Sequence, residues 1–157
     1  MIERVYLDSS VIGGCYDDEF AEWSNALMQD FRAGQFKPIL SETVEVEIAT
    51  APGIVRDRLA ELLALDHEML PVTETALGLA AVYIDRGILT AKFNADGLHI
   101  ALATLAEVDV LVSWNFKHIV HFDKIRLFNA VNIERGYRPL QIYTPREVTK
   151  YGSQEDV

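Results

Sequence analysis

The sequence Arg4-Val5-Tyr6-Leu7-Asp8-Ser9-Ser10 joins a short apolar run to a cluster of polar residues. The run predicts a buried strand, and the polar cluster predicts the turn that ends it. The same order returns where Val110-Leu111-Val112 is followed by Ser113-Trp114-Asn115. Strands that are continuous apolar runs are typical of parallel sheets covered by helices on both faces. We therefore expect an α/β protein, a three-layer α/β/α sandwich with a mainly parallel central sheet.

The rest of the chain supplies further elements in alternation. Strands are predicted at 4–7, 37–40, 69–72, 108–112 and 140–143. Apolar residues recur at helical spacing over 17–32, 42–50, 54–65, 73–86 and 95–107, followed by a partly helical stretch at 118–134 and a helix start at 144–147. Because no repeat or linker divides the chain, residues 1–150 are expected to form one domain and 151–157 a flexible tail.

Composition limits the classes of protein to which the chain can belong. It has 157 residues, 50% of them hydrophobic, and no apolar run approaches the roughly 18 residues of a membrane span. The start lacks the pattern of a secretory signal, and Cys15 is the only cysteine, so we expect a cytoplasmic protein without an intrachain disulfide. The net charge of −10 opposes binding to nucleic acid. Cations nevertheless gather in the C-terminal third, at Lys117, Lys124, Arg126, Arg135, Arg138 and Arg146.

Ligands of parallel α/β sheets bind beyond the carboxyl ends of the strands. Three polar clusters follow predicted strand ends here, namely Asp8-Ser9-Ser10, Ser41 with the acidic helix after it, and Ser113-Trp114-Asn115. Asp96, in the first turn of a later helix, is expected at the same edge. Carboxylate and amide oxygens are the ligands that Mg²⁺ and Mn²⁺ prefer. The sequence therefore predicts a site for a divalent cation.

Each of these residues also has a structural interpretation. An aspartate after a strand can simply cap a helix, and the helix dipole favours Asp96 in a first turn whatever its function. Glu45 and Glu47 both border an apolar stripe, so spacing does not choose between them as ligands. His99 lies one turn after Asp96 and can assist a metal or a phosphate, or it can be an ordinary histidine of the core.

With these residues assembled, the chain resembles the PIN-domain family, and within it the VapC-type toxins of bacterial and archaeal toxin–antitoxin pairs. The resemblance rests on residues 5–12, on 39–41 leading to Glu47, and on 94–101 and 111–116. It implies a PIN-like nuclease domain over 1–150 that uses Mg²⁺ or Mn²⁺ to hydrolyse RNA. The implied partners are the RNA substrate, a second copy of the chain in a homodimer, and a small antitoxin protein, with no membrane.

The resemblance also implies a role for individual residues. Asp8, Glu47 and Asp96 correspond to the family's catalytic, metal-binding acids. Asn115 falls where many relatives have a fourth aspartate, so it is a further metal ligand that brings no charge. Auxiliary roles fall to Ser9, Ser113 and His99, which can orient a ligand or a phosphate.

Two other functions remain open. The chain can be a similar domain that has lost turnover and binds RNA or protein, an alternative favoured by Asn115 and by the acidic composition. It can also be a phosphatase or hydrolase with Asp8 as nucleophile, although Asp8-Ser9-Ser10 lacks the second aspartate that such enzymes place two residues later.

Overall fold

The structure is a computed structural model that describes residues 1–151. Its strands are β1 (Glu3–Leu7), β2 (Phe36–Ser41), β3 (Glu68–Leu70), β4 (Val110–Val112) and β5 (Ile142–Tyr143). Its helices are α1 (Ser9–Gly14), α2 (Ala21–Arg32), α3 (Glu42–Ile48), α4 (Gly53–Ala64), α5 (Glu74–Asp85), the 3-10 helix η1 (Ala91–Phe93), α6 (Asn94–Leu105), α7 (Phe122–Glu134) and α8 (Pro145–Val148). The expected flexible tail, 151–157, lies outside the described residues except for Tyr151.

All five strands pair in parallel, in the order β3-β2-β1-β4-β5. Central strand β1 pairs on both sides, so that Val5 lies opposite Pro38 of β2 and Val110 of β4. The chain moves outward from β1 to β3 and then returns to the other side of β1 for β4 and β5. The order therefore reverses between β1 and β4, which is where parallel α/β sheets open a crevice for ligands. Asp8 and Ser113 directly follow these two strands.

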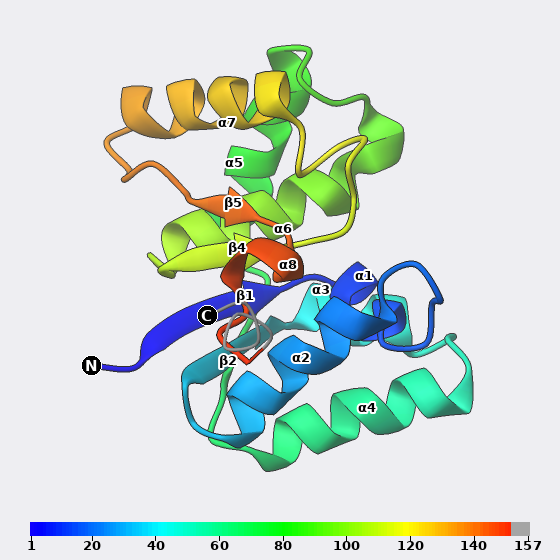
Figure 1. Cartoon of the computed structure of the whole chain (residues 1–157). Coiled ribbons are helices and arrows are strands. Elements are labelled where there is room, and N and C mark those ends of the chain that lie inside the picture. Colours follow the sequence, from blue (N-terminus) through cyan, green and yellow to red (C-terminus); the bar gives the residue numbers. More distant parts are fainter. Residues whose placement is uncertain (152–157) are drawn as a thin grey trace.

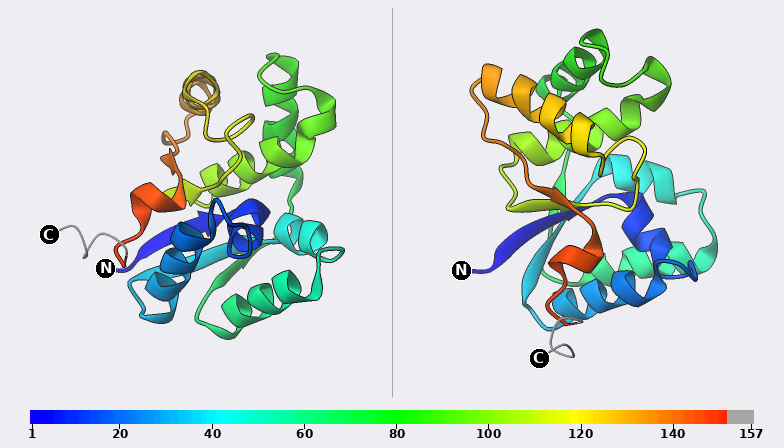
Figure 2. Two further views of the ribbon diagram at one scale, coloured as in Figure 1. Left: turned by 45° about the vertical axis from the view of Figure 1, so that its right-hand side comes forward. Right: turned by 45° about the horizontal axis from the view of Figure 1, so that its top comes forward.

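Helices cover both faces of the sheet (Figures 1 and 2), with α1 to α4 on one face and α5 to α7 on the other. The alternation of side chains along β1 explains the two cores. Val5 and Leu7 pack with apolar residues of α1 to α4, whereas Tyr6 packs with those of α5 to α7. The predicted three-layer sandwich with a parallel central sheet is confirmed.

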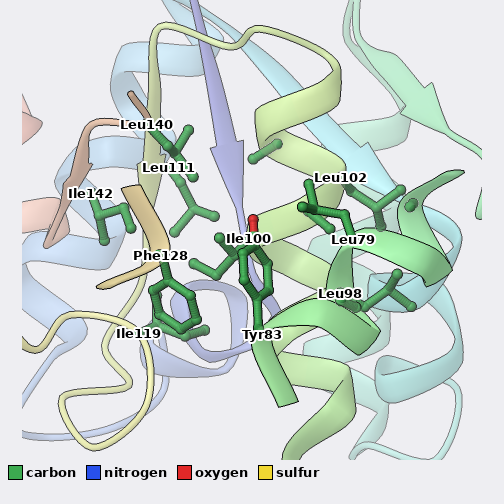
Figure 3. Close-up of a cluster of buried hydrophobic side chains, with 14 of the residues drawn as sticks. Leu79, Tyr83, Leu98, Ile100, Leu102, Leu111, Ile119, Phe128, Leu140 and Ile142 are labelled. Atoms are coloured by element: carbon green, nitrogen blue, oxygen red, sulfur yellow. The ribbon is translucent and has the colours of Figure 1, made fainter. Parts of the chain in front are cut away.

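The core under α5, α6 and α7 is a cluster of buried hydrophobic side chains that includes Tyr83 and Phe128 (Figure 3), and it also contains a buried polar chain. Tyr83 lies edge-on to Phe128, with 5.0 Å between the ring centroids, and its hydroxyl donates to Asn132 at 2.5 Å. Asn132 in turn donates to the Thr104 hydroxyl at 3.1 Å. Buried polar groups must find partners inside the protein, and these three satisfy one another. Helix α6 is buried continuously from Gly97 to Thr104, which fixes its position against β1 and β4.

Local structure departs from the sequence predictions at the first helix and at several boundaries, with β4 and β5 each beginning two residues later than predicted. Residues 9–14 form α1, where only a turn was predicted. The sequence did not indicate this helix because two of its six residues are glycines, and because it is too short to show two full turns of an apolar pattern. Helix α2 begins at Ala21, after a loop rather than at residue 17. Strand β3 is shifted to 68–70. Within residues 1–151, no helix is long and apolar enough to cross a membrane.

Helix α1 packs closely against α2 and the loop after β4. The Ser24 hydroxyl of α2 donates to the Val11 carbonyl at 2.8 Å and accepts from the Trp114 indole N–H at 2.8 Å. A Cβ atom on Gly14 would lie 2.7 Å from the Ser24 hydroxyl and 2.9 Å from the Trp114 ring. A Cβ atom on Gly13 would meet nothing within 4 Å.

These two adjacent glycines provide a matched test of the packing. Gly14→Ala is expected to lower the free energy of unfolding by about 1–3 kcal/mol, because the new methyl group overpacks a fixed contact. Gly13→Ala should be neutral or stabilise by up to about 1 kcal/mol, since alanine favours a helix. Urea denaturation of both variants measures the difference. Equal effects of the two substitutions would contradict the packing described here.

Candidate functional site

Asp8 is buried at the carboxyl end of β1, with only 4% of its surface exposed. It stands at the N-cap position of α1, yet its side chain makes no capping hydrogen bond. Instead, one carboxylate oxygen accepts from the Ser10 hydroxyl at 2.6 Å and the other from the Ser113 hydroxyl at 2.7 Å. The carboxylate therefore links α1 to the loop after β4, rather than serving as a helix cap.

Burial raises the pKa of Asp8, because a carboxylate loses its hydration in the protein interior. The nearby His99 and the two serine hydroxyls oppose this shift by favouring the charged form, and the Glu47 carboxylate adds to it. Asp8 is thus an acid whose ionised form needs local positive charge or hydrogen-bond donors.

Glu47 reaches the same place from α3 through a chain of short hydrogen bonds. One of its carboxylate oxygens accepts from the Ser9 hydroxyl at 2.8 Å and from His99 Nε2 at 2.6 Å. On the other side of the imidazole, His99 Nδ1 lies 2.6 Å from the Tyr6 hydroxyl, which lies 2.7 Å from the Ser41 hydroxyl. His99 is 1% exposed and Tyr6 is fully buried, so this chain fixes Glu47 from inside the core.

The hydrogen-bond chain has a consistent direction. Ser41 caps α3, as predicted, and accepts from the Val44 backbone N–H at 3.3 Å, which leaves its own proton for the Tyr6 oxygen. A neutral His99 can then accept from Tyr6 at Nδ1 and donate from Nε2 to Glu47. Although burial works against each charged form, their mutual hydrogen bond lowers the pKa of Glu47 and raises the pKa of His99. The lowered pKa of Glu47 favours its ionised form.

Asp96 completes the set from the first turn of α6, one turn before His99. Within residues 1–151 its carboxylate has neither a hydrogen bond nor an ion pair. Burial raises its pKa, the charges of Asp8 and Glu47 add to this shift, and His99 and His118 oppose it. Asp96 is thus a half-buried acid without a bonded partner, close enough to two other acids to interact with their charges.

The structure thus brings Asp8, Glu47 and Asp96 to one edge of the sheet. Ser9, which bonds Glu47, is the neighbour of Asp8 in the chain, and His99, which also bonds Glu47, lies three residues after Asp96. No group of three or more His, Cys, Asp or Glu side chains within residues 1–151 is arranged to hold one metal ion. Glu47 uses one carboxylate oxygen for its hydrogen bonds with Ser9 and His99.

The chemistry of these donors nevertheless fits Mg²⁺ or Mn²⁺. Three carboxylates supply hard oxygen ligands, and the sulfur and tetrahedral nitrogen ligands typical of zinc sites are missing from the set. Asp96 has no bonded partner, and the pKa of each aspartate is raised partly by the neighbouring acids. A bound divalent cation would relieve that mutual repulsion.

The remaining candidates have distinct positions. Asn115 accepts from the His118 backbone N–H at 2.9 Å through its side-chain oxygen, which is the role of a local turn residue. Ser9 and Ser113 each donate to one of the acids. Glu45 and Glu47 are both exposed on α3, but Glu47 bonds Ser9 and His99, so the geometry chooses Glu47 between the two glutamates.

Sequence reasoning did not assign Tyr6, Ser10 or Ser41 to the site. Ser10 donates to Asp8 and accepts from the Trp114 backbone N–H at 2.9 Å. Its spacing of two residues from Asp8 is a signal of local hydrogen bonding. Tyr6 is the one residue with a hydroxyl inside the apolar run 5–7, and a buried tyrosine hydroxyl usually has a partner.

Comparisons with known proteins identify similar folds. No family model matches the chain, and no curated protein matches it by sequence. The structure of VapBC2 from Rickettsia felis, bound to a DNA fragment from its promoter, is similar with a TM-score of 0.56 and 14% identity, covering 90% of this chain and 98% of that one. FitAcB from Neisseria gonorrhoeae gives a TM-score of 0.56 and 18% identity, covering 92% of this chain and 99% of that one. The TM-scores show a shared fold, and at such low identities they show the fold alone.

The comparisons correct the family assignment. The assignment of the chain to the PIN-domain family and its VapC-type toxins is wrong, whereas the PIN-like label for the domain 1–150 stays a prediction. No family model matches, and the similar structures share only 14% and 18% identity with this chain, so the likeness shows a fold and not membership of that family. Strand-end runs such as Leu-Asp-Ser-Ser satisfy turn chemistry in many parallel α/β proteins, so they carry little information on family.

When no divalent cation is present, Asp8→Asn is expected to gain stability relative to the wild type as the pH rises. Because burial raises the pKa of Asp8, the folded state keeps a proton at pH values where the unfolded chain has lost it. Wild-type stability from this group therefore falls as the pH rises above about 4. Asparagine cannot ionise, so the gain in unfolding free energy should grow with pH and level off once Asp8 is ionised in the folded protein.

Thermal unfolding in EDTA across a pH series measures this gain. In a domain of this size, each kcal/mol of unfolding free energy raises the melting temperature by about 2–4 °C. Glu45→Gln, which changes an exposed acid, is the control and should show no such trend. A gain from Asp8→Asn that is the same at pH 4 and at pH 8, taken as rough end points, would contradict the burial argument.

Proposed function

We propose that this protein is a metal-dependent ribonuclease that hydrolyses RNA phosphodiester bonds. The observation that carries the proposal is the convergence of Asp8, Glu47 and Asp96, from three separate elements, at the switch point of a parallel sheet. Asp8 is buried and accepts two hydrogen bonds, Glu47 accepts two more, and Asp96 lacks a bonded partner within residues 1–151. Sites with acids in such environments are candidates for chemistry.

In this proposal, Asp8, Glu47 and Asp96 would hold Mg²⁺ or Mn²⁺, which supplies a Lewis acid that lowers the pKa of water and offsets phosphoryl charge. The chain's own groups prepare the carboxylates. Ser10 and Ser113 hold both oxygens of Asp8 in one orientation. His99 and Ser9 hold one oxygen of Glu47 and leave the other without a hydrogen bond from residues 1–151. Such partners around metal ligands orient them and tune their affinity.

We place this activity in a toxin–antitoxin pair, with the chain as the hydrolytic member. The support is the similarity of fold to chains of VapBC2 and FitAcB, both of which are toxin–antitoxin complexes. A small antitoxin protein is then the expected partner, and pairing of two copies of the chain remains a prediction. The exposed apolar residues of α7, among them Phe122 at 74% and Ile133 at 57%, are available for such contacts.

A second candidate function is binding without turnover. It is favoured by Asn115, whose side-chain oxygen is used within its own loop, by the net charge of −10, and by the engagement of Glu47 with His99. The phosphatase alternative has less support, because both oxygens of Asp8 already accept hydrogen bonds and the residue is buried.

Substitution of the three acids tests the ribonuclease proposal. Asp8→Asn, Glu47→Gln and Asp96→Asn should each lower Mn²⁺-dependent cleavage of single-stranded RNA by at least about 100-fold, the effect of losing one group that stabilises transition-state charge. Glu45→Gln lies on the same helix, α3, and should keep wild-type activity. Cleavage at the wild-type rate by Asp8→Asn would reject this site.

Metal binding by itself separates the enzyme from the inactive module. At a concentration of 100 times Kd, Mn²⁺ should raise the melting temperature of the wild-type protein by about 5–10 °C, since a ligand that binds only the folded state adds about 2.7 kcal/mol. The shift should be largely lost in Asp96→Asn. If Mn²⁺ leaves the wild-type melting temperature unchanged, the binding module becomes the better description.

A further inference from the structure

The loop 113–118, between β4 and α7, is fixed directly to the partners of Asp8. Its first residue donates to Asp8, and the backbone N–H of Trp114 donates to the Ser10 hydroxyl at 2.9 Å. The indole N–H of Trp114 is held by Ser24 at 2.8 Å. Side chains from this loop therefore have defined positions beside the carboxylate site.

Trp114 and Phe116 of this loop line a cavity of about 430 Å³, together with Phe20 and Trp23. Phe20 stacks on Trp114, with 4.4 Å between centroids and 16° between planes. Phe116 lies 6.3 Å from both rings and is 50% exposed, so much of its ring remains open. Binding pockets for small ligands have volumes of roughly 300–1,000 Å³. The cavity has the size and the aromatic walls of a stacking site for a planar ring.

The polar groups of this cavity indicate which planar ring it suits. Glu19, Arg146 and Glu147 also line it, and the Arg146 guanidinium lies 5.2 Å from the centre of the Trp23 ring. Two carboxylates disfavour a phosphate group. They can instead accept from the amino groups of a nucleobase, as acidic side chains do in base recognition. The combination favours a base with its phosphates outside the cavity.

The next two residues of the loop meet a different group of side chains. His118 packs on Phe93, with 3.9 Å between centroids. The ammonium groups of Lys117 and Lys92 lie 6.0 Å and 5.6 Å from the centre of the Phe93 ring. Phe93 stands immediately before α6, three residues from Asp96. Two cations are thus held near the acid that opens α6.

These lysines remain available for an anion. Within residues 1–151, neither Lys92 nor Lys117 forms an ion pair, and both are exposed. By contrast, ion pairs with acids engage Arg4, Arg32, Lys37, Arg58, Arg86 and Arg138. In a chain of net charge −10, two unpaired cations beside an acidic site provide local charge complementarity to a phosphate backbone.

We propose that the loop 113–118 forms a binding track for single-stranded RNA, in which a base stacks in the cavity of Phe20, Trp114 and Phe116 while Lys92 and Lys117 contact phosphates. A single strand is required because the bases of a duplex are paired and cannot be turned out onto an aromatic ring without cost. The proposal deepens the proposed function, on which it rests for the position of the carboxylate site. It adds a base-stacking pocket and names the residues that read the strand.

The test measures binding in EDTA, where no metal-dependent cleavage takes place. Fluorescence anisotropy compares a labelled single-stranded oligocytidylate, whose bases carry an amino group, with an RNA duplex of equal length. The wild-type protein should bind the single strand more tightly. Phe116→Ala should weaken this binding at least about 5-fold, as expected for the loss of one stacked base. Lys117→Ala should also weaken binding, and it should reduce the slope of log Kd against the logarithm of the salt concentration by about one.

Matched controls come from α7 and the residue that follows it, Arg135. Phe122 is 74% exposed, and the Arg126 guanidinium lies 5.4 Å from the centre of its ring. Phe122→Ala and Arg135→Ala remove an exposed ring and an exposed cation elsewhere, and both should bind RNA as the wild type does. The proposal is overturned if Phe116→Ala and Lys117→Ala retain wild-type affinity, if the controls weaken binding equally, or if the duplex is preferred. If Phe116→Ala and Lys117→Ala retain wild-type affinity, a protein partner becomes the better candidate to occupy the cavity.

This experiment also separates the two proposals. If the protein binds single-stranded RNA through the loop but cleaves none with Mn²⁺, the binding track is supported and the ribonuclease proposal is rejected. If the protein cleaves RNA while both variants bind it normally, the ribonuclease proposal is supported and the binding track is rejected. Melting temperatures of Phe116→Ala and Lys117→Ala should equal that of the wild type, since both side chains are exposed.

Discussion

The burial of the Asp8 carboxylate at the end of β1 is the constraint from which the candidate site follows. A central parallel strand places this acid between two other strands and beneath α1, where it has little contact with water. It can remain there because the hydroxyls of Ser10 and Ser113 donate to its two oxygens. Those bonds in turn fix the start of α1 and the loop after β4, so the fold and the site share the same contacts.

A second buried chain supports the other acid. Tyr6 is the one side chain of β1 that brings a hydroxyl into the α5 to α7 core, and it lies between Ser41 and His99. His99 then carries this connection to Glu47. Two strands and two helices thus define the position of a glutamate that has 34% of its side chain exposed. The polar chain is satisfied along its length, which makes it a rigid support.

The loop 113–118 connects the acidic centre to its surroundings. Its serine bonds Asp8, its aromatic residues line a cavity, and its lysine lies near Phe93. This arrangement shows how a chain with a net charge of −10 can present cations locally while several other cations pair with acids on the surface. The overall charge of a protein therefore says less about a polyanionic substrate than the positions of its unpaired cations.

The sequence by itself determined the α/β class, the parallel sheet and the polar strand ends at Asp8 and Ser113, because apolar runs and turn residues are local signals. It also identified the helix cap at Ser41. The short helix α1, the choice of Glu47 over Glu45 and the bonds of Asp8 were decided only by tertiary structure, since each depends on residues distant in the chain. The family could not be read from short strand-end motifs, which many parallel sheets share. Likewise, Tyr6 joined the site only when β1 turned its hydroxyl toward His99, a contact between residues 93 positions apart.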